Sequence, residues 1–169
     1  KADSNIISNL LKQRKYKRTN INRARFLIIN TCAVKEQTEN KIKSRLKRLY
    51  RKYGNNQVKE IIITGCLPHI TSNYIDIIRG IVPNFAAIVD MNSIDQIPKI
   101  LERIKENEKN LIYISSDHID KSEFCIEYNP NKITGIVPIS EGCLGSCTYC
   151  CVKNARGRLT CFSPSNIIK

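Results

Sequence analysis

The sequence lacks several features that would assign it to common classes of protein. No apolar stretch approaches the roughly 20 residues of a membrane-spanning helix, so we expect no membrane segment within the chain. There is no secretory signal, internal repeat or long low-complexity tract. The eight cysteines are therefore expected in a reducing, cytoplasmic compartment, where thiols serve metals or catalysis more often than disulfides.

Acidic side chains are also scarce relative to basic ones. The 169 residues include 28 Lys and Arg but only 15 Asp and Glu, which gives a formal net charge of +13. Such an excess favours an anionic partner. Nucleic acid is the first candidate, because phosphate neutralisation supplies affinity without reading a sequence. The alternative is a compositional bias that only decorates solvated faces.

Short apolar runs alternate with helical patterns along most of the chain. Strands are predicted at 26–29, 60–64, 85–89 and 111–114, and helices at about 3–11, 35–53, 74–78 and from 93 onwards. Alternating strands and helices are typical of βαβ units. The sequence therefore predicts an α/β fold with a mostly parallel sheet.

A polar connector over 115–132 is predicted to contain a domain boundary. We expect an amino-terminal, cluster-binding domain over 1–128 and the beginning of a second domain over 129–169. The second domain would contain a strand at 133–139, a loop and the start of a helix. Because residue 1 is Lys and both ends resemble interrupted elements, we expect a fragment that lacks both flanks.

Three cysteines stand close together within 143–150, spaced C-x3-C-x2-C in a glycine-containing loop. Three thiolates can hold three corners of an iron–sulfur cubane and leave the fourth iron open, which makes Cys143, Cys147 and Cys150 predicted cluster ligands. Structural zinc is the main alternative, but it usually takes two C-x2-C pairs or a combination of Cys and His, and only one C-x2-C pair is present. Together with Cys151, these residues are too crowded to form disulfides of good geometry.

Two further cysteines, Cys32 and Cys66, each follow the end of a predicted strand. Ligands gather outside the carboxyl ends of parallel strands, so adjacent strands would bring these two thiols together. Two thiols are too few for a cubane, and we expect a third ligand upstream of Lys1. The alternative is that both are small buried residues without a metal.

The other candidate residues have weaker patterns. Three cysteines are expected to be incidental and two histidines are assigned to no site: Cys125, Cys151, Cys161, His69 and His118. Tyr149 can offer an aromatic face to a flat ring near the cluster, or it can simply pack. Arg156 and Arg158 either meet a phosphate or carboxylate through paired donors or are solvated.

These cysteine segments resemble those of the methylthiotransferase branch of the radical S-adenosylmethionine enzymes. Residues 141–150 resemble the family's cluster loop, and 155–157 resemble the arginine–glycine pair that follows it. Residues 30–35 and 64–68 resemble its amino-terminal cluster segments, and Asp3-Ser4 resembles the end of a segment whose cysteine would lie just upstream. The resemblance covers nearly the whole chain in the right order.

The resemblance implies an enzyme with two 4Fe-4S clusters. Cys143, Cys147 and Cys150 would hold the cluster that binds S-adenosylmethionine. An electron donor protein would drive cleavage of that cofactor to a 5′-deoxyadenosyl radical, which takes hydrogen from C2 of an adenine. Cys32, Cys66 and an upstream cysteine would hold the second cluster, which handles the sulfur of the methylthio group.

The resemblance also implies a substrate. Residues 153–157 resemble the archaeal and eukaryotic type, which acts on N6-threonylcarbamoyladenosine 37 beside the tRNA anticodon. Basic helices would hold tRNA phosphates, Tyr149 would contact the cofactor, and 129–169 would begin a radical S-adenosylmethionine (β/α) partial barrel. The alternatives are isopentenyladenosine tRNA or a ribosomal protein as the substrate, and a non-catalytic metal- or RNA-binding module. This chain alone is expected to be inactive.

Overall fold

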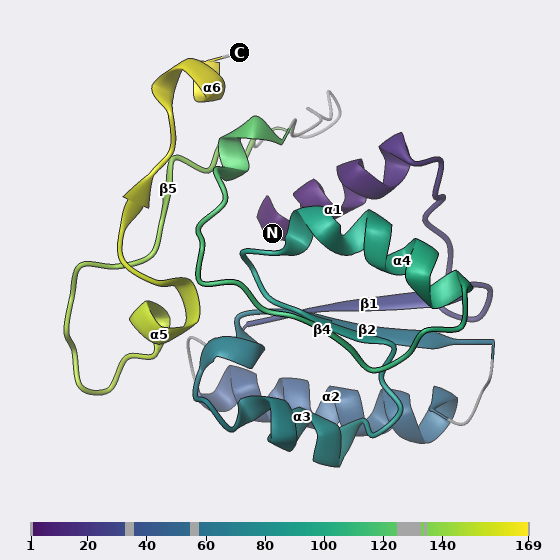
Figure 1. Cartoon of the computed structure of the whole chain (residues 1–169). Coiled ribbons are helices and arrows are strands. Elements are labelled where there is room, and N and C mark those ends of the chain that lie inside the picture. Colours follow the sequence, from purple (N-terminus) through teal and green to yellow (C-terminus); the bar gives the residue numbers. More distant parts are fainter. Residues whose placement is uncertain (1, 33–35, 55–57, 125–132, 134, 169) are drawn as a thin grey trace.

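A computed structural model describes residues 2–32, 36–54, 58–124, 133 and 135–168. Its main body is a parallel sheet in the order β1-β2-β3-β4 with helices on both faces (Figure 1). The strands are β1 (Phe26–Thr31), β2 (Glu60–Gly65), β3 (Ala87–Val89) and β4 (Leu111–Tyr113). The predicted α/β class with a parallel sheet is confirmed.

Four longer helices form the layers around the sheet. They are α1 (Ala2–Gln13), α2 (Glu36–Tyr53), α3 (Tyr74–Ile81) and α4 (Ile97–Lys105). Figure 1 shows α1 and α4 against one face and α2 and α3 against the other. Short 3-10 turns follow several strands: η1 (Leu67–His69), η2 (Ile94–Gln96) and η3 (Lys121–Glu123).

The core lies on both sides of β2, which is buried along its whole length. Leu27 of β1 pairs with Ile61 of β2, and Ile62 pairs with Ala87 of β3. Because helices cover both faces, alternate side chains of β2 all enter apolar layers. This explains why its sequence is a continuous apolar run instead of an alternating one.

The helices bury the faces that their spacing predicts. In α4, Ile97, Leu101 and Ile104 are buried, and Pro98 lies in the first turn, where a missing N–H costs little. In α2, Leu46 is fully buried, while the lysines and arginines of the helix face outward. Within the described residues, no helix is both long and apolar enough to cross a membrane.

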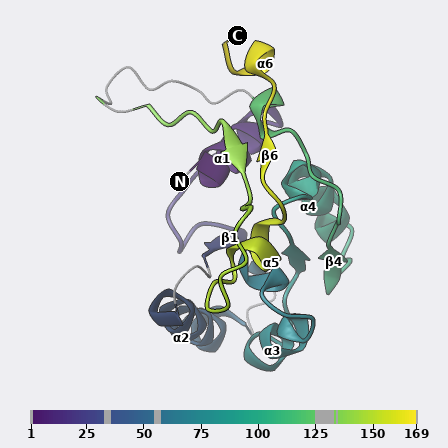
Figure 2. The same ribbon diagram turned by 90° about the vertical axis from the view of Figure 1, so that its left-hand side faces the viewer.

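The last described segment contains only short elements. They are β5 (Ser140–Glu141), α5 (Val152–Arg156), β6 (Thr160–Cys161) and α6 (Pro164–Ile168), and β5 pairs antiparallel with β6. Figure 1 shows this segment to one side of the main body, and in Figure 2 it runs in front of the main body, with α5 near the sheet. The predicted strand at 133–139 is wrong in its position, since residues 135–139 have no regular structure and strand pairing begins at Ser140. Val137 and Ile139 are exposed, and the run meets a neighbouring chain segment only at its end, where the Ile139 carbonyl oxygen accepts from the Phe162 backbone N–H at 2.9 Å.

Candidate functional site

The two strands that precede Cys32 and Cys66 end side by side. Thr31, the last residue of β1, pairs with Gly65, the last residue of β2. The Cys66 backbone N–H donates to the Thr31 carbonyl oxygen at 3.2 Å. Both cysteines therefore lie at the carboxyl edge of the sheet, which is where the strand pattern predicts them.

Thr31 fixes the turn that carries Cys66. Its buried hydroxyl donates to the Thr64 carbonyl oxygen at 2.7 Å and accepts from the Leu67 backbone N–H at 3.2 Å. Gly65 adopts a φ of 109°, and a Cβ at this position would lie 2.2 Å from the Thr31 carbonyl oxygen. The close approach of the two strand ends therefore requires a glycine.

The two thiols have different surroundings. Cys32 is exposed, whereas Cys66 is fully buried. Burial raises the pKa of the Cys66 thiol, and the Arg156 guanidinium, whose Nε donates to Sγ at 3.2 Å, opposes this rise. One thiol is thus open to solvent, and the other is enclosed with a cationic donor.

The loop with Cys143, Cys147 and Cys150 connects β5 to α5. The Cys143 backbone N–H donates to the Gly157 carbonyl oxygen at 3.2 Å, which closes the base of the loop. A Cβ at Gly145 would lie 3.4 Å from the sulfur of Cys143 and 3.8 Å from that of Cys147. The two sulfurs thus border a space that a side chain would fill. The Gly145 N–H also donates to the Cys143 sulfur at 3.3 Å.

The loop is open to solvent. Cys147 is exposed, Cys143 and Cys150 are partly exposed, and Tyr149 is 90% exposed. Tyr149 therefore does not pack into the core, and its ring remains accessible. Three cysteines around a bare glycine match an iron–sulfur cluster in the type of donor.

Helix α5 brings the cysteine loop to the carboxyl edge of the sheet. It packs against η1, the turn after Cys66, and Ala155 joins the hydrophobic core. Burial raises the pKa of Cys151 at the start of α5, and Cys150, Glu39 and Cys32 raise it further. These interactions place Cys151 near both cysteine segments, although the sequence pattern indicates no role for it.

The thiols are gathered without enclosing a common point. Among the described residues, no group of three or more His, Cys, Asp or Glu side chains is arranged to hold a metal ion. None of the seven described cysteines is in a disulfide bond. Cys125 lies outside the described residues, and Cys161 is exposed in β6, away from the cysteine loop in sequence.

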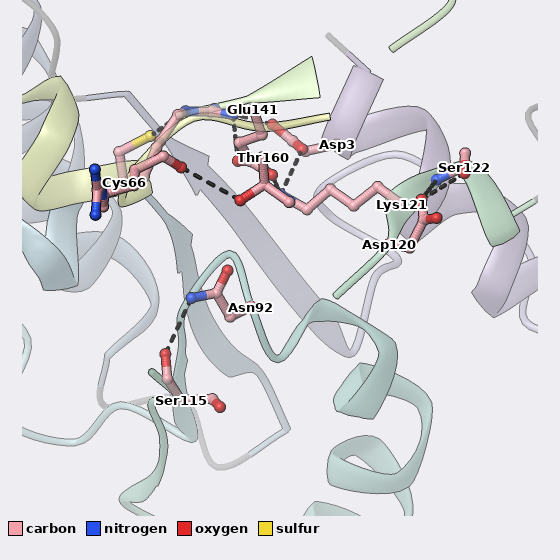
Figure 3. Close-up of polar contacts among 11 residues, drawn as sticks. Asp3, Cys66, Asn92, Ser115, Asp120, Lys121, Ser122, Glu141 and Thr160 are labelled. Atoms are coloured by element: carbon pink, nitrogen blue, oxygen red, sulfur yellow. Dashed lines mark hydrogen bonds and ion pairs between the residues drawn. The ribbon is translucent and has the colours of Figure 1, made fainter. Parts of the chain in front are cut away.

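Arg156 lies in a largely buried network of charges that the sequence pattern does not reveal, and whose members Asp3, Lys121 and Glu141 are labelled in Figure 3. Its Nη1 donates to Glu141 at 2.7 Å, and its Nη2 donates to Asp3 at 3.1 Å. Lys121 forms ion pairs with both carboxylates. Arg156 therefore contacts carboxylates and is not fully solvated, but its two donors bind two different carboxylates and not one carboxylate through a paired contact. The partners were missed because they come from distant elements.

His69 has a structural partner. Its Nε2 lies 2.7 Å from an oxygen of Asp90, a fully buried residue just after β3. The same oxygen accepts the Ser115 backbone N–H at 2.8 Å, and Asn92 donates to the Ser115 carbonyl oxygen. This contact ties η1 to the ends of β3 and β4. It supports the turn after Cys66 without placing His69 among the thiols.

Comparison with known proteins shows what this chain is similar to. Residues 1–82 match the family described as "Uncharacterized protein family UPF0004". A Pyrococcus horikoshii protein named "Probable threonylcarbamoyladenosine tRNA methylthiotransferase" is 38% identical over 145 residues, which cover 84% of this chain and 31% of that protein. A Methanocaldococcus jannaschii protein with the same name is 35% identical over 170 residues, covering 99% of this chain and 36% of that protein. Over most of its length the chain is therefore similar to proteins named tRNA methylthiotransferases.

Bacterial members of the family are also similar to this chain. A Clostridium beijerinckii protein named "tRNA-2-methylthio-N(6)-dimethylallyladenosine synthase" is 32% identical over 171 residues, covering 98% of this chain and 36% of that protein. The chain spans about a third of the length of the curated relatives it matches, between 31% and 36% for these three. The similarity therefore concerns about a third of each of these proteins.

Replacing Gly65 by Ala is expected to destabilise the chain. The new Cβ would collide with Thr31 and the positive φ would be strained, so we expect a loss of more than about 1 kcal/mol in the free energy of unfolding. Gly80 is the matched control, because it lies in α3 and a Cβ there meets no atom within 4 Å. Gly80→Ala should stabilise by about 0.5–1 kcal/mol. Urea unfolding of both variants measures this, and equal midpoints would contradict it.

Proposed function

We propose that this chain is part of a radical S-adenosylmethionine tRNA methylthiotransferase. The reaction would add a methylthio group to C2 of N6-threonylcarbamoyladenosine 37, beside the anticodon. The observation that carries the proposal is the C-x3-C-x2-C loop held, through α5 and η1, at the sheet edge that presents Cys32 and Cys66. The archaeal relatives named for threonylcarbamoyladenosine are 30–38% identical and the bacterial relatives named for dimethylallyladenosine are 30–32% identical, so only the highest identities support this substrate.

In this proposal, Cys143, Cys147 and Cys150 hold a 4Fe-4S cluster. When bound, the cluster and S-adenosylmethionine supply the radical chemistry, which belongs to the cofactor and not to the side chains. The chain provides three thiolates, a glycine that leaves room between two of them, and an N–H that donates to the Cys143 sulfur. The exposed ring of Tyr149 is free to stack on the adenine of the cofactor. The exposed loop also leaves room for an electron donor protein.

Cys32 and Cys66 would supply two ligands of a second 4Fe-4S cluster. Three thiolates are needed to hold three corners of a cubane, so the third ligand is proposed to come from outside the described residues. Adjacent strand ends are a suitable base for such a site, because the Thr31 hydroxyl and the Gly65 backbone fix their spacing. The second cluster would lie beside the first, since α5 and η1 are packed together.

A tRNA substrate requires a surface for phosphates, and we assign this role to the outward face of α2. The helix has seven lysines and arginines, and a surface pocket on it is lined by Asn40, Lys41, Ser44, Arg45 and Arg48. Lys43 is engaged with Glu39 at 2.6 Å, whereas Lys41, Arg45 and Arg48 are exposed. Backbone contacts of this kind would position the tRNA without reading bases. A cytoplasmic location follows from such a substrate and is part of the proposal.

Replacing Cys143, Cys147 and Cys150 together by Ala should remove one of two clusters. After anaerobic reconstitution with iron and sulfide, the intact gene product should lose about half of its iron and acid-labile sulfide. S-adenosylmethionine should also no longer change its paramagnetic-resonance spectrum. Cys161→Ala is the control, because Cys161 is exposed in β6 and should leave the iron content unchanged. Iron content that survives the triple replacement, or a single tetrahedral zinc in the parent, would refute this assignment.

Neutralising the basic face of α2 should weaken tRNA binding in a salt-dependent manner. Arg45→Gln and Arg48→Gln should each lower the slope of log affinity against log salt concentration by about 0.7–0.9 if the side chain neutralises one phosphate. Lys99→Gln is the control, since Lys99 is an exposed base on α4. Fluorescence anisotropy with labelled tRNA between low and physiological salt measures the slopes. Identical slopes for all three variants would argue against α2 as the phosphate surface.

The modified nucleosides of cells that lack the gene identify the substrate. We expect the methylthio derivative of N6-threonylcarbamoyladenosine to disappear and the unmodified nucleoside to accumulate. Mass spectrometry of digested tRNA measures both. Disappearance of the methylthio derivative of isopentenyladenosine would instead favour the bacterial type. If neither nucleoside changes, a ribosomal protein substrate or a non-catalytic role replaces the proposal.

A further inference from the structure

We propose that Arg156 is a positioning residue for Cys66. Through its Nε–H it holds the Cys66 sulfur at the carboxyl edge of the sheet, and through its other donors it ties that sulfur to the segment with the cysteine loop. The proposal deepens the proposed function, because it takes Cys66 as a cluster ligand. The contact between the two side chains does not itself depend on a cluster.

Every nitrogen of the Arg156 guanidinium has a partner. Nε donates to the Cys66 sulfur at 3.2 Å, Nη1 to Glu141 at 2.7 Å, and Nη2 to Asp3 at 3.1 Å. A guanidinium is planar and its donors have fixed directions, so two carboxylates on one side determine where the remaining donor points. The direction of Nε–H toward the sulfur is therefore set by Glu141 and Asp3.

The carboxylates that orient Arg156 are themselves held in place. The side chains of Asp3 and Glu141 are 11% and 7% exposed, and Lys121, at 2%, forms an ion pair with each of them. Two cations and two carboxylates balance within this group, as buried charges require. Figure 3 shows Asp3, Glu141 and Lys121 in one connected set of contacts that reaches Cys66. Each charge of the group is paired with opposite charges, so the group holds the Arg156 Nε–H donor in place.

The contact bridges distant parts of the chain. Arg156 and Cys66 are 90 positions apart, and Arg156 and Asp3 are 153 positions apart. Asp3 belongs to α1, Cys66 follows β2, and Arg156 ends α5 after the cysteine loop. The same side chain therefore fixes a thiol of the sheet edge relative to the segment that carries Cys143, Cys147 and Cys150.

A donor at a cysteine sulfur has a measurable consequence in an iron–sulfur protein. Hydrogen bonds to the sulfurs help to set the reduction potential of a cluster, since they stabilise its more negative, reduced form. Removing the Arg156 donor should therefore shift the potential of the cluster at Cys66 to lower values. A residue that only supported the fold would leave the potential of a correctly folded protein unchanged.

The test isolates the cluster at Cys32 and Cys66. The intact gene product with Ala at positions 143, 147 and 150 is reconstituted anaerobically, and the potential of the remaining cluster is followed by paramagnetic resonance. R156M should lower this potential, and R156K, which keeps a charge and a donor, should restore part of the shift. R158M is the matched control, because Arg158 is an exposed arginine two positions away. Equal potentials in R156M, R158M and the parent would overturn the proposal.

A second measurement does not require a cluster. In the metal-free protein, unfolding midpoints of R156M, C66A and the double variant form a double-mutant cycle. Coupled side chains should make the double variant lose less stability than the two single losses add up to. Additive losses would overturn the proposal, and R156K replaces R156M in both experiments if R156M does not fold. Coupling in a parent that takes up no cluster would instead support the contact and refute the amino-terminal cluster of the proposed function.

Discussion

The close approach of β1 and β2 at Thr31 and Gly65 determines the geometry of the whole carboxyl edge. The Thr31 hydroxyl bonds to both sides of the turn after β2, and the backbone at Gly65 leaves no room for a side chain. This contact fixes where Cys32 and Cys66 leave the sheet. It also fixes η1, the turn on which α5 packs. The placement of the cysteine loop is therefore a consequence of how two strands meet.

The elements of the main body could be predicted because their signals are local. Apolar runs predicted the strands, because helices cover both faces of the sheet. Helical spacing of apolar residues predicted α2 and α4. The predicted strand at 133–139 was misplaced because an apolar run forms a strand only beside another strand. Its side chains are instead exposed in the described structure. The domain boundary near 128 stays a prediction, since residues 125–132 lie outside the described part of the chain.

The candidate site could be predicted in part. The spacing of the loop cysteines predicted them as ligands, and the ends of the predicted strands did the same for Cys32 and Cys66. Both predictions were possible because each pattern lies within a short stretch of sequence. The environment of Cys66 could not be predicted, since its donor Arg156 and the carboxylates of Asp3 and Glu141 come from three separate elements. The structure adds that Arg156 connects the buried Cys66 thiol to the segment that carries the cysteine loop.

The length of chain between Asp3 and Arg156 has a consequence for biosynthesis. The guanidinium that neutralises Asp3 is 153 positions downstream, so it leaves the ribosome long after α1 and the sheet have been made. Domains tend to fold as units during synthesis, starting from the amino terminus. The nascent sheet domain is therefore made before the Arg156 guanidinium is available to Asp3 and Cys66. Only after translation past position 156 can the Cys66 sulfur gain its guanidinium donor.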